Sequence, residues 1–118
     1  MDFDQAIVAH SAWKLKLAAY IRKPDGSLNS VDVGADNKCA LGQWIYGEGS
    51  KYSSFPEFSV LKSEHARFHV AAADIIKKAD SRQQVTEDFA LGSKSAFAEA
   101  SGRVVTAIMK MKRNATAA

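Results

Sequence analysis

Residues 56–78, PEFSVLKSEHARFHVAAADIIKK, contain the pattern that decides the fold. Apolar side chains recur there at steps of three and four residues, which is the spacing of one face of an α-helix. Pro56, with Ser53 or Ser54 shortly before it, is typical of a helix entry. His65 and His69 lie on the apolar face, four residues apart, so both imidazoles are expected to point away from solvent. This stretch predicts a long amphipathic helix that carries two buried histidines.

The flanking sequence predicts more helices. Apolar periodicity indicates a helix from Phe3 to Lys23 and a final long helix from about Phe89 to Met111, whose inward face includes Ser93. A short helix is expected around Cys39, with Asp36 or Asn37 as its N-cap, Cys39 in its first turn and Gly47 at its end, and residues 28–36 are interpreted as a loop. Short connections between long helices favour antiparallel neighbours. The predicted fold class is all-α: an antiparallel four-helix bundle with an additional or partly substituted short helix that carries the cysteine.

Length and composition favour a single domain over residues 1–118, with a core of about 3–113 and a frayed tail at 114–118. The chain is 47% hydrophobic and 25% charged, and no apolar run is long enough to predict membrane insertion. The acidic opening shows no signal peptide, so we expect a cytoplasmic location. The net charge of +3 accompanies no nucleic-acid recognition motif, and we expect no nucleic-acid partner.

The three histidines and the one cysteine predict a metal site. His10 falls on the inward face of the first helix, and Cys39 lies at the start of the short helix. With His65 and His69 they supply three imidazole nitrogens and one thiolate, a set that fills the four positions of tetrahedral zinc. A filled coordination sphere argues for structure or sensing and against catalysis, because no position remains for a reactive water.

Each ligand also has an ordinary interpretation, as a core histidine or a small buried hydrophobe. Taken together that interpretation is weaker, because three unpaired imidazoles in one core would be costly to bury. We also considered a Cys/His or zinc hydrolase, a hemerythrin-like di-iron bundle and a metal-free helical interaction module. The di-iron centre would need more histidines and paired inward carboxylates than the chain offers. A metal-free module would keep its helicity and stability after chelation.

The flanks of the ligands carry a family resemblance. They read His10-x-x-Trp13, then Cys39-x-Leu41-Gly42-x-Trp44, then His65-x-x-x-His69. Together these motifs resemble the chemoreceptor zinc-binding (CZB) domain of bacterial chemoreceptors and diguanylate cyclases, over nearly the whole chain.

The resemblance implies a helical bundle that binds Zn²⁺ through the His, Cys, His and His that map onto His10, Cys39, His65 and His69. It also implies a cytosolic, non-catalytic regulatory domain, commonly a homodimer, that senses zinc and oxidants such as hypochlorous acid. Such a domain modulates a signalling partner in chemotaxis or cyclic-di-GMP output.

Residues near the ligands have expected supporting roles. Trp13 and Trp44 are interpreted as packing that shields the site from water, and Gly42 as a position of close approach between elements. The carboxylates nearest in sequence are candidates to orient an imidazole, although solvated surface positions fit them as well: Asp36, Glu64 and Asp74. A helix start and a bound zinc ion would both favour the Cys39 thiolate, and its oxidation to a sulfenic acid would weaken zinc binding.

Overall fold

The computed structural model describes residues 3–81, 86 and 90–117, and every regular element within them is helical. In chain order the elements are α1 (Phe3–Arg22), α2 (Ser30–Gly34), α3 (Ala40–Tyr46), the 3₁₀ helix η1 (Glu48–Tyr52), α4 (Pro56–Asp80) and α6 (Ala96–Ala117). The predicted all-α fold class is therefore confirmed for these residues.

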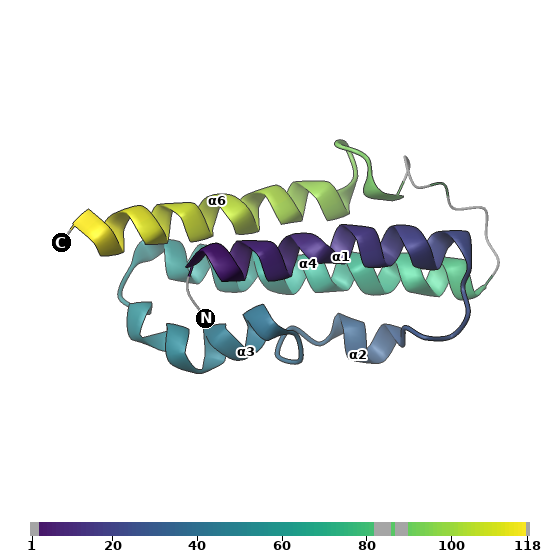
Figure 1. Cartoon of the computed structure of the whole chain (residues 1–118), viewed down its shortest axis with the longest axis horizontal. Coiled ribbons are helices and arrows are strands. Elements are labelled where there is room, and N and C mark those ends of the chain that lie inside the picture. The colour runs from purple at the N-terminus through teal and green to yellow at the C-terminus, as the bar shows by residue number, and fades with distance from the viewer. Residues whose placement is uncertain (1–2, 82–85, 87–89, 118) are drawn as a thin grey trace.

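The three long helices pack against one another, and α2 and α3 follow each other along the remaining side (Figure 1). The chain runs in one direction through α1 and α4 and in the opposite direction through the α2–α3 segment and α6 (Figure 1). Two short helices therefore occupy the place that a fourth long helix would take. This arrangement brings α3 next to α1 and α2 next to α4.

Residues 30–34 form the short helix α2, so the interpretation of the whole 28–36 stretch as a loop was wrong. Asn29 caps α2: its side-chain oxygen accepts hydrogen bonds from the backbone N–H groups of Val31 (2.9 Å) and Asp32 (3.2 Å). Val33, in the same turn, is only 6% exposed. A cap and one buried apolar side chain suffice for a single helical turn, although five residues are too few to show helical periodicity.

The last helix begins later than the sequence suggested. Ser95 caps α6, because its hydroxyl oxygen accepts a hydrogen bond from the Ala98 N–H at 3.1 Å and donates one to the Gly92 carbonyl at 2.7 Å. The turn at residues 92–95 therefore separates the buried Ala90 and Leu91 from α6. Ser93, which we placed on the inward face of a continuous helix, lies in this turn, and Phe89 lies outside the described residues.

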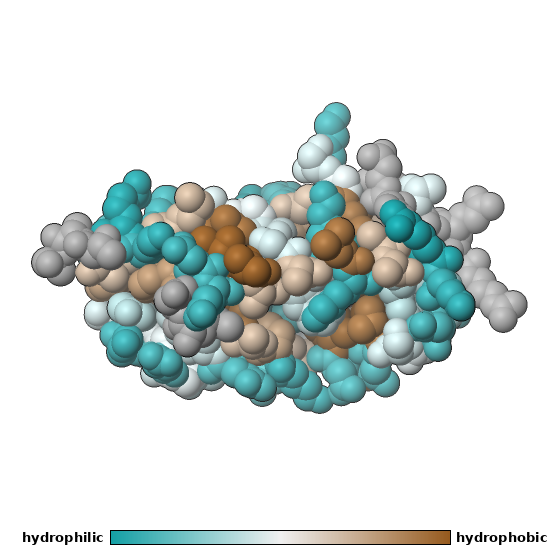
Figure 2. Space-filling view, in the orientation of Figure 1, coloured by the Kyte–Doolittle hydropathy of each residue, from teal (hydrophilic) through white to brown (hydrophobic). Residues whose placement is uncertain are grey.

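At the other end, α6 continues to Ala117. None of the described helices combines the length and the hydropathy needed to cross a membrane. The face that carries α1 is largely hydrophilic or neutral, with a few separate hydrophobic patches (Figure 2).

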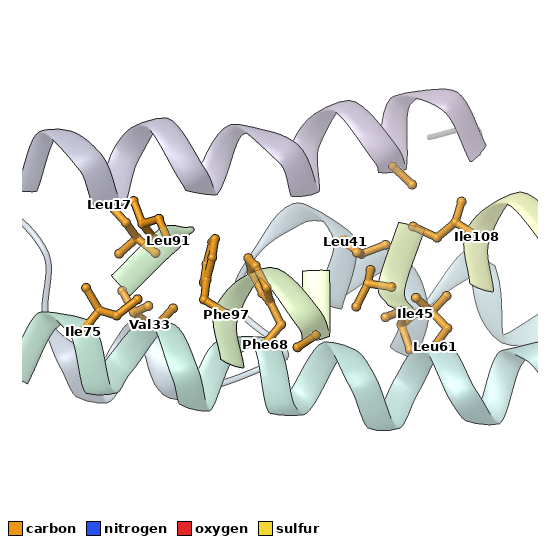
Figure 3. Packing of buried hydrophobic residues seen from close by; sticks show 14 of the residues in the cluster. Leu17, Val33, Leu41, Ile45, Leu61, Phe68, Ile75, Leu91, Phe97 and Ile108 are labelled. Atoms are coloured by element: carbon orange, nitrogen blue, oxygen red, sulfur yellow. The ribbon is translucent and has the colours of Figure 1, made fainter. Parts of the chain in front are cut away.

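The buried core lies along the inside of the long helices. One group of side chains gathers around Leu41, Ile45, Leu61 and Ile108, and another around Leu17, Val33, Ile75 and Leu91 (Figure 3). Phe68 and Phe97 pack against each other between the two groups, with ring centroids 4.7 Å apart and planes tilted by 38°. Since Leu61 and Ile75 flank residues 65–69 on α4, both histidines of this helix sit at the middle of the core.

Candidate metal centre

Cys39, His65 and His69 meet in the core. The Cys39 Sγ lies 3.3 Å from the Nε2 atom of each histidine, and the two Nε2 atoms lie 3.0 Å apart. Both histidines are 1% exposed, whereas Cys39 is half-buried. Among the described residues, these three form a group whose ligand atoms all lie within 4.8 Å of one another.

These distances fit a tetrahedral ion. Zinc bonds of about 2.0–2.1 Å to nitrogen and 2.3 Å to sulfur, at tetrahedral angles, put neighbouring ligand atoms roughly 3.3–3.6 Å apart. The three observed separations are a little shorter, at 3.0–3.3 Å. One sulfur and two nitrogens converging at this spacing fit zinc, because thiolate and imidazole are the ligands that this ion prefers.

Cys39 reaches the cluster because it is the N-cap residue of α3. Its backbone is extended (φ −79°, ψ 165°), and its Sγ accepts a hydrogen bond from the Gly42 N–H at 3.2 Å. We expected Cys39 inside the first turn, with Asp36 or Asn37 as the cap. The cap position instead turns the side chain toward α4, since an N-cap residue directs its side chain back over the helix start.

Gly42 allows the chain before Cys39 to pass close to α3. A Cβ atom at this position would lie 1.8 Å from the backbone oxygen of Asp36. Only glycine therefore fits here without movement of the backbone. This agrees with the interpretation of Gly42 as a position of close approach, and the approach fixes the segment that delivers the cysteine.

His69 is oriented by a main-chain carbonyl. Its Nδ1 atom lies 2.7 Å from the Val33 carbonyl oxygen of α2. A carbonyl can only accept, so Nδ1 carries the proton and donates it. The neutral ring then presents its Nε2 lone pair to the cluster, which is the arrangement found for most metal-bound histidines. The Nδ1 atom of His65 is buried and has no hydrogen-bond partner among the described residues.

His10 lies beside the cluster but outside it. Its ring centroid is 6.5 Å from that of His65, and its Nε2 atom lies 3.0 Å from the Ser101 hydroxyl on α6. The structure thus brings together three of the four expected ligands and gives the fourth another partner.

Burial keeps the three histidines neutral. Burial and the neighbouring His69 lower the pKa of His10 to about 4, and burial with the same neighbour lowers the pKa of His65 to about 3. Burial also lowers the pKa of His69, against the opposing effect of the Val33 carbonyl. Neutral imidazoles at pH 7 are the form that binds metal.

The protein alone does not favour the Cys39 thiolate, contrary to our expectation from its place at a helix start. Burial raises the pKa of the thiol, and the opposing hydrogen bond from the Gly42 N–H is smaller in effect. A bound cation would reverse this balance, because a coordinated thiol loses its proton.

Of the tryptophans and carboxylates expected to support the site, only Trp13 contacts one of the cluster ligands among the described residues. Trp13 shields the site, with its ring edge-to-face with His69 at 5.6 Å. Trp44 packs away from it, against Phe3 and Tyr52. None of the three candidate carboxylates contacts a ligand through the hydrogen bonds and ion pairs of the described residues: Asp36 accepts from Tyr46, Glu64 pairs with Arg67 and Arg103, and Asp74 pairs with Lys78.

Comparison with known proteins assigns the chain to a family. The model of the chemoreceptor zinc-binding domain matches residues 10–76, a span that contains all three cluster residues. This chain belongs to the chemoreceptor zinc-binding domain family. Zinc is the cofactor of this family, and the cluster of Cys39, His65 and His69 could hold the ion. No curated protein and no solved structure matches the chain.

Proposed function

We propose that this chain is a regulatory domain that binds one zinc ion through Cys39, His65 and His69, with His10 as the fourth ligand. The observation that carries the proposal is the convergence of one sulfur and two imidazole nitrogens at 3.0–3.3 Å in the core. The tautomer that the Val33 carbonyl imposes on His69 supports it independently. Because Cys39 caps α3 while His65 and His69 belong to α4, zinc would join the short helix to the long one, and His10 would add α1.

The proposed role is regulation and not catalysis. The family consists of sensor domains. Four protein ligands would leave no coordination position for a reactive water, and the ligands are themselves the obvious acid–base groups of the site. We further propose that the domain is cytoplasmic and that it acts on bacterial signalling, in chemotaxis or in the control of cyclic-di-GMP.

Metal content tests the zinc site. The untagged protein, purified and dialysed, should contain about one zinc per chain by plasma mass spectrometry. Cys39→Ala, His65→Ala and His69→Ala should each lose most of it, because three ligands do not hold zinc as four do. Val70→Ala is the matched control, since Val70 follows His69 on α4 but is 65% exposed. No zinc in the parent protein after zinc is supplied would overturn the proposal.

We propose that the domain responds to oxidation of Cys39 as well as to zinc. The Cys39 thiolate, which a bound zinc ion would keep deprotonated, would attack hypochlorous acid: an S–O bond forms, the O–Cl bond breaks, chloride leaves, and the cysteine becomes a sulfenic acid. Sulfenic acid is a poorer ligand than thiolate, and α3 would lose its tie to α4. One equivalent of hypochlorous acid should release zinc to a chromophoric chelator from the parent protein. Retained zinc together with a detected sulfenic acid would contradict this route.

A homodimer is the proposed assembly. Val8 and Leu15 on α1 are 70% and 76% exposed, and their seven-residue separation places them on one side of the helix. Hydrophobic patches appear on the face that carries α1 (Figure 2). Sedimentation equilibrium of the parent and of the Leu15→Glu variant tests this: the parent should be a dimer and the variant a monomer.

A further inference from the structure

His10 is buried but only half satisfied. It is 2% exposed, and its Nε2 atom is bonded to the Ser101 hydroxyl at 3.0 Å. Its Nδ1 atom is also buried and has no hydrogen-bond partner among the described residues. The buried ring is therefore held in this position by a single hydrogen bond, and its unpaired Nδ1 atom adds a free-energy cost to that position.

The ring lies between two such partners. Ser101 on α6 is on one side, and the cluster is near enough that the His10 and His65 ring centroids are 6.5 Å apart. Both clustered histidines present Nε2 to the cluster, and Nε2 is the atom that His10 gives to Ser101. A change of side-chain rotamer moves the tip of an imidazole by several ångströms without moving the helix. This displacement is comparable with the 6.5 Å between the His10 and His65 ring centroids.

We propose that Ser101 competes with the metal for the Nε2 atom of His10, so that the His10–Ser101 hydrogen bond and a His10–zinc bond through Nε2 exclude each other. This inference rests on the proposed zinc site. Ser101 belongs to α6, far in sequence from the three cluster residues. Under the proposal, its hydrogen bond to His10 lowers the affinity of the site for zinc, because His10 must leave Ser101 before it can act as the fourth ligand. The competition also gives zinc binding a route to α6, because loading would break a polar contact between α1 and α6.

If His10 moved away, the Ser101 hydroxyl could still form a hydrogen bond with water. Ser101 is half-buried and lines a cavity of about 290 Å³ together with Lys14 and Gly102, both of which are exposed. Water can reach such a site and replace the lost hydrogen bond. The competition is therefore between a single neutral hydrogen bond and a metal–ligand bond, which allows the two states to exchange.

Zinc affinity of a Ser101→Ala variant tests the proposal. Without the hydroxyl, His10 loses its alternative partner, and the variant should bind zinc about two- to tenfold more tightly than the parent, the worth of one neutral hydrogen bond. Affinity is measured by competition with a chromophoric chelator on the full, untagged chain. Ser59→Ala, which removes an exposed serine from α4, should match the parent. Alanine is a good helix former, so the variant should fold.

A double-mutant cycle separates competition from a general effect on stability. In a His10→Ala background, which should bind zinc more weakly, adding Ser101→Ala should leave the affinity unchanged. An increase that persists in that background would overturn the proposal.

Three further outcomes are distinguishable in the same titrations. If the parent and the Ser101→Ala variant bind zinc with equal affinity, the competition alone is overturned. Weaker zinc binding by the variant would also overturn it, and would make Ser101 an orienting partner of a ligating His10. A parent that binds no zinc would overturn the zinc site, and the competition with it.

Discussion

The His69 side chain on α4 donates a hydrogen bond to the Val33 carbonyl on α2, with 2.7 Å between Nδ1 and the oxygen. This bond connects the metal cluster to the segment that replaces part of a fourth helix. It orients the imidazole and fixes its tautomer, so the position of α2 should affect metal affinity.

Gly34 tests this connection. It ends α2, and a Cβ atom there would lie 3.3 Å from the Ala73 Cβ on α4, which is tight enough to push the two helices apart by a few tenths of an ångström. Gly34→Ala should weaken zinc binding by about two- to tenfold, below the 10–100-fold typical when such an orienting partner is lost entirely. Adding Ala73→Gly should restore the affinity, and Ala73→Gly alone serves as the control. Parent-like affinity in Gly34→Ala would show that the Val33 carbonyl does not tune the site.

The packing at Gly42 leads to a stronger prediction. A Cβ atom 1.8 Å from the Asp36 oxygen cannot be accommodated, so Gly42→Ala must displace the segment that carries Cys39. We expect the variant to lose at least about 2 kcal/mol of unfolding free energy in urea titrations and most of its zinc. Gly102→Ala is the matched control: it lies in a helix with nothing within 4 Å of the added Cβ, and it should gain about 0.5–1 kcal/mol. Similar results for both variants would contradict the steric argument.

The sequence predicted the parts of the site that depend on side-chain type and helical spacing. His65 and His69 share a face because they are four residues apart, and a cysteine beside a helix start is a good candidate to join them. The pattern could not predict that the main-chain carbonyl of Val33 orients His69, since every residue has such a carbonyl. Nor could it predict the His10–Ser101 contact, which joins residues 91 positions apart and depends on how α1 and α6 pack.

The helix ends show the same limit. The sequence favoured a continuous helix through residues 89–111, because apolar spacing persisted across the turn. Ser95 interrupts the helix, because its hydroxyl forms local hydrogen bonds with the Gly92 carbonyl and the Ala98 N–H. Such side-chain bonds to the backbone compete with the hydrogen bonds of a continuous helix.

Acid should destabilise the protein after zinc has been removed with a chelator. The pKa is about 4 for His10 and about 3 for His65 in the folded state, against about 6.5 in an unfolded chain. Below pH 6.5 the unfolded chain therefore binds more protons than the folded one, and stability falls as the pH falls. Between pH 6.5 and 5 the loss should be roughly 2 kcal/mol or less for each histidine, measured by urea unfolding. His10→Asn, which removes one titrating group, should flatten the dependence. A stability that is constant over this range would contradict burial of neutral histidines.

Two tyrosine–aspartate hydrogen bonds allow the effect of tyrosine burial on stability to be compared, because the donor and acceptor groups are the same in both. Tyr20 donates to Asp80 at 2.5 Å and is 3% exposed, whereas Tyr46 donates to Asp36 at 2.7 Å and is 46% exposed. The first bond joins the end of α1 to the end of α4, and the Asp80 carboxylate raises the pKa of Tyr20. Tyr20→Phe should cost about 1–2 kcal/mol of unfolding free energy, because the lost hydrogen bond runs from a buried tyrosine to a charged carboxylate, Asp80, which is itself exposed.

Tyr46→Phe should cost less than about 0.5 kcal/mol, since water replaces the phenol as the partner of Asp36. Urea unfolding of both variants and the parent at pH 7 measures the difference. Equal losses would mean that the Tyr20–Asp80 bond contributes no more than a surface contact, and that apolar packing alone holds the ends of α1 and α4 together.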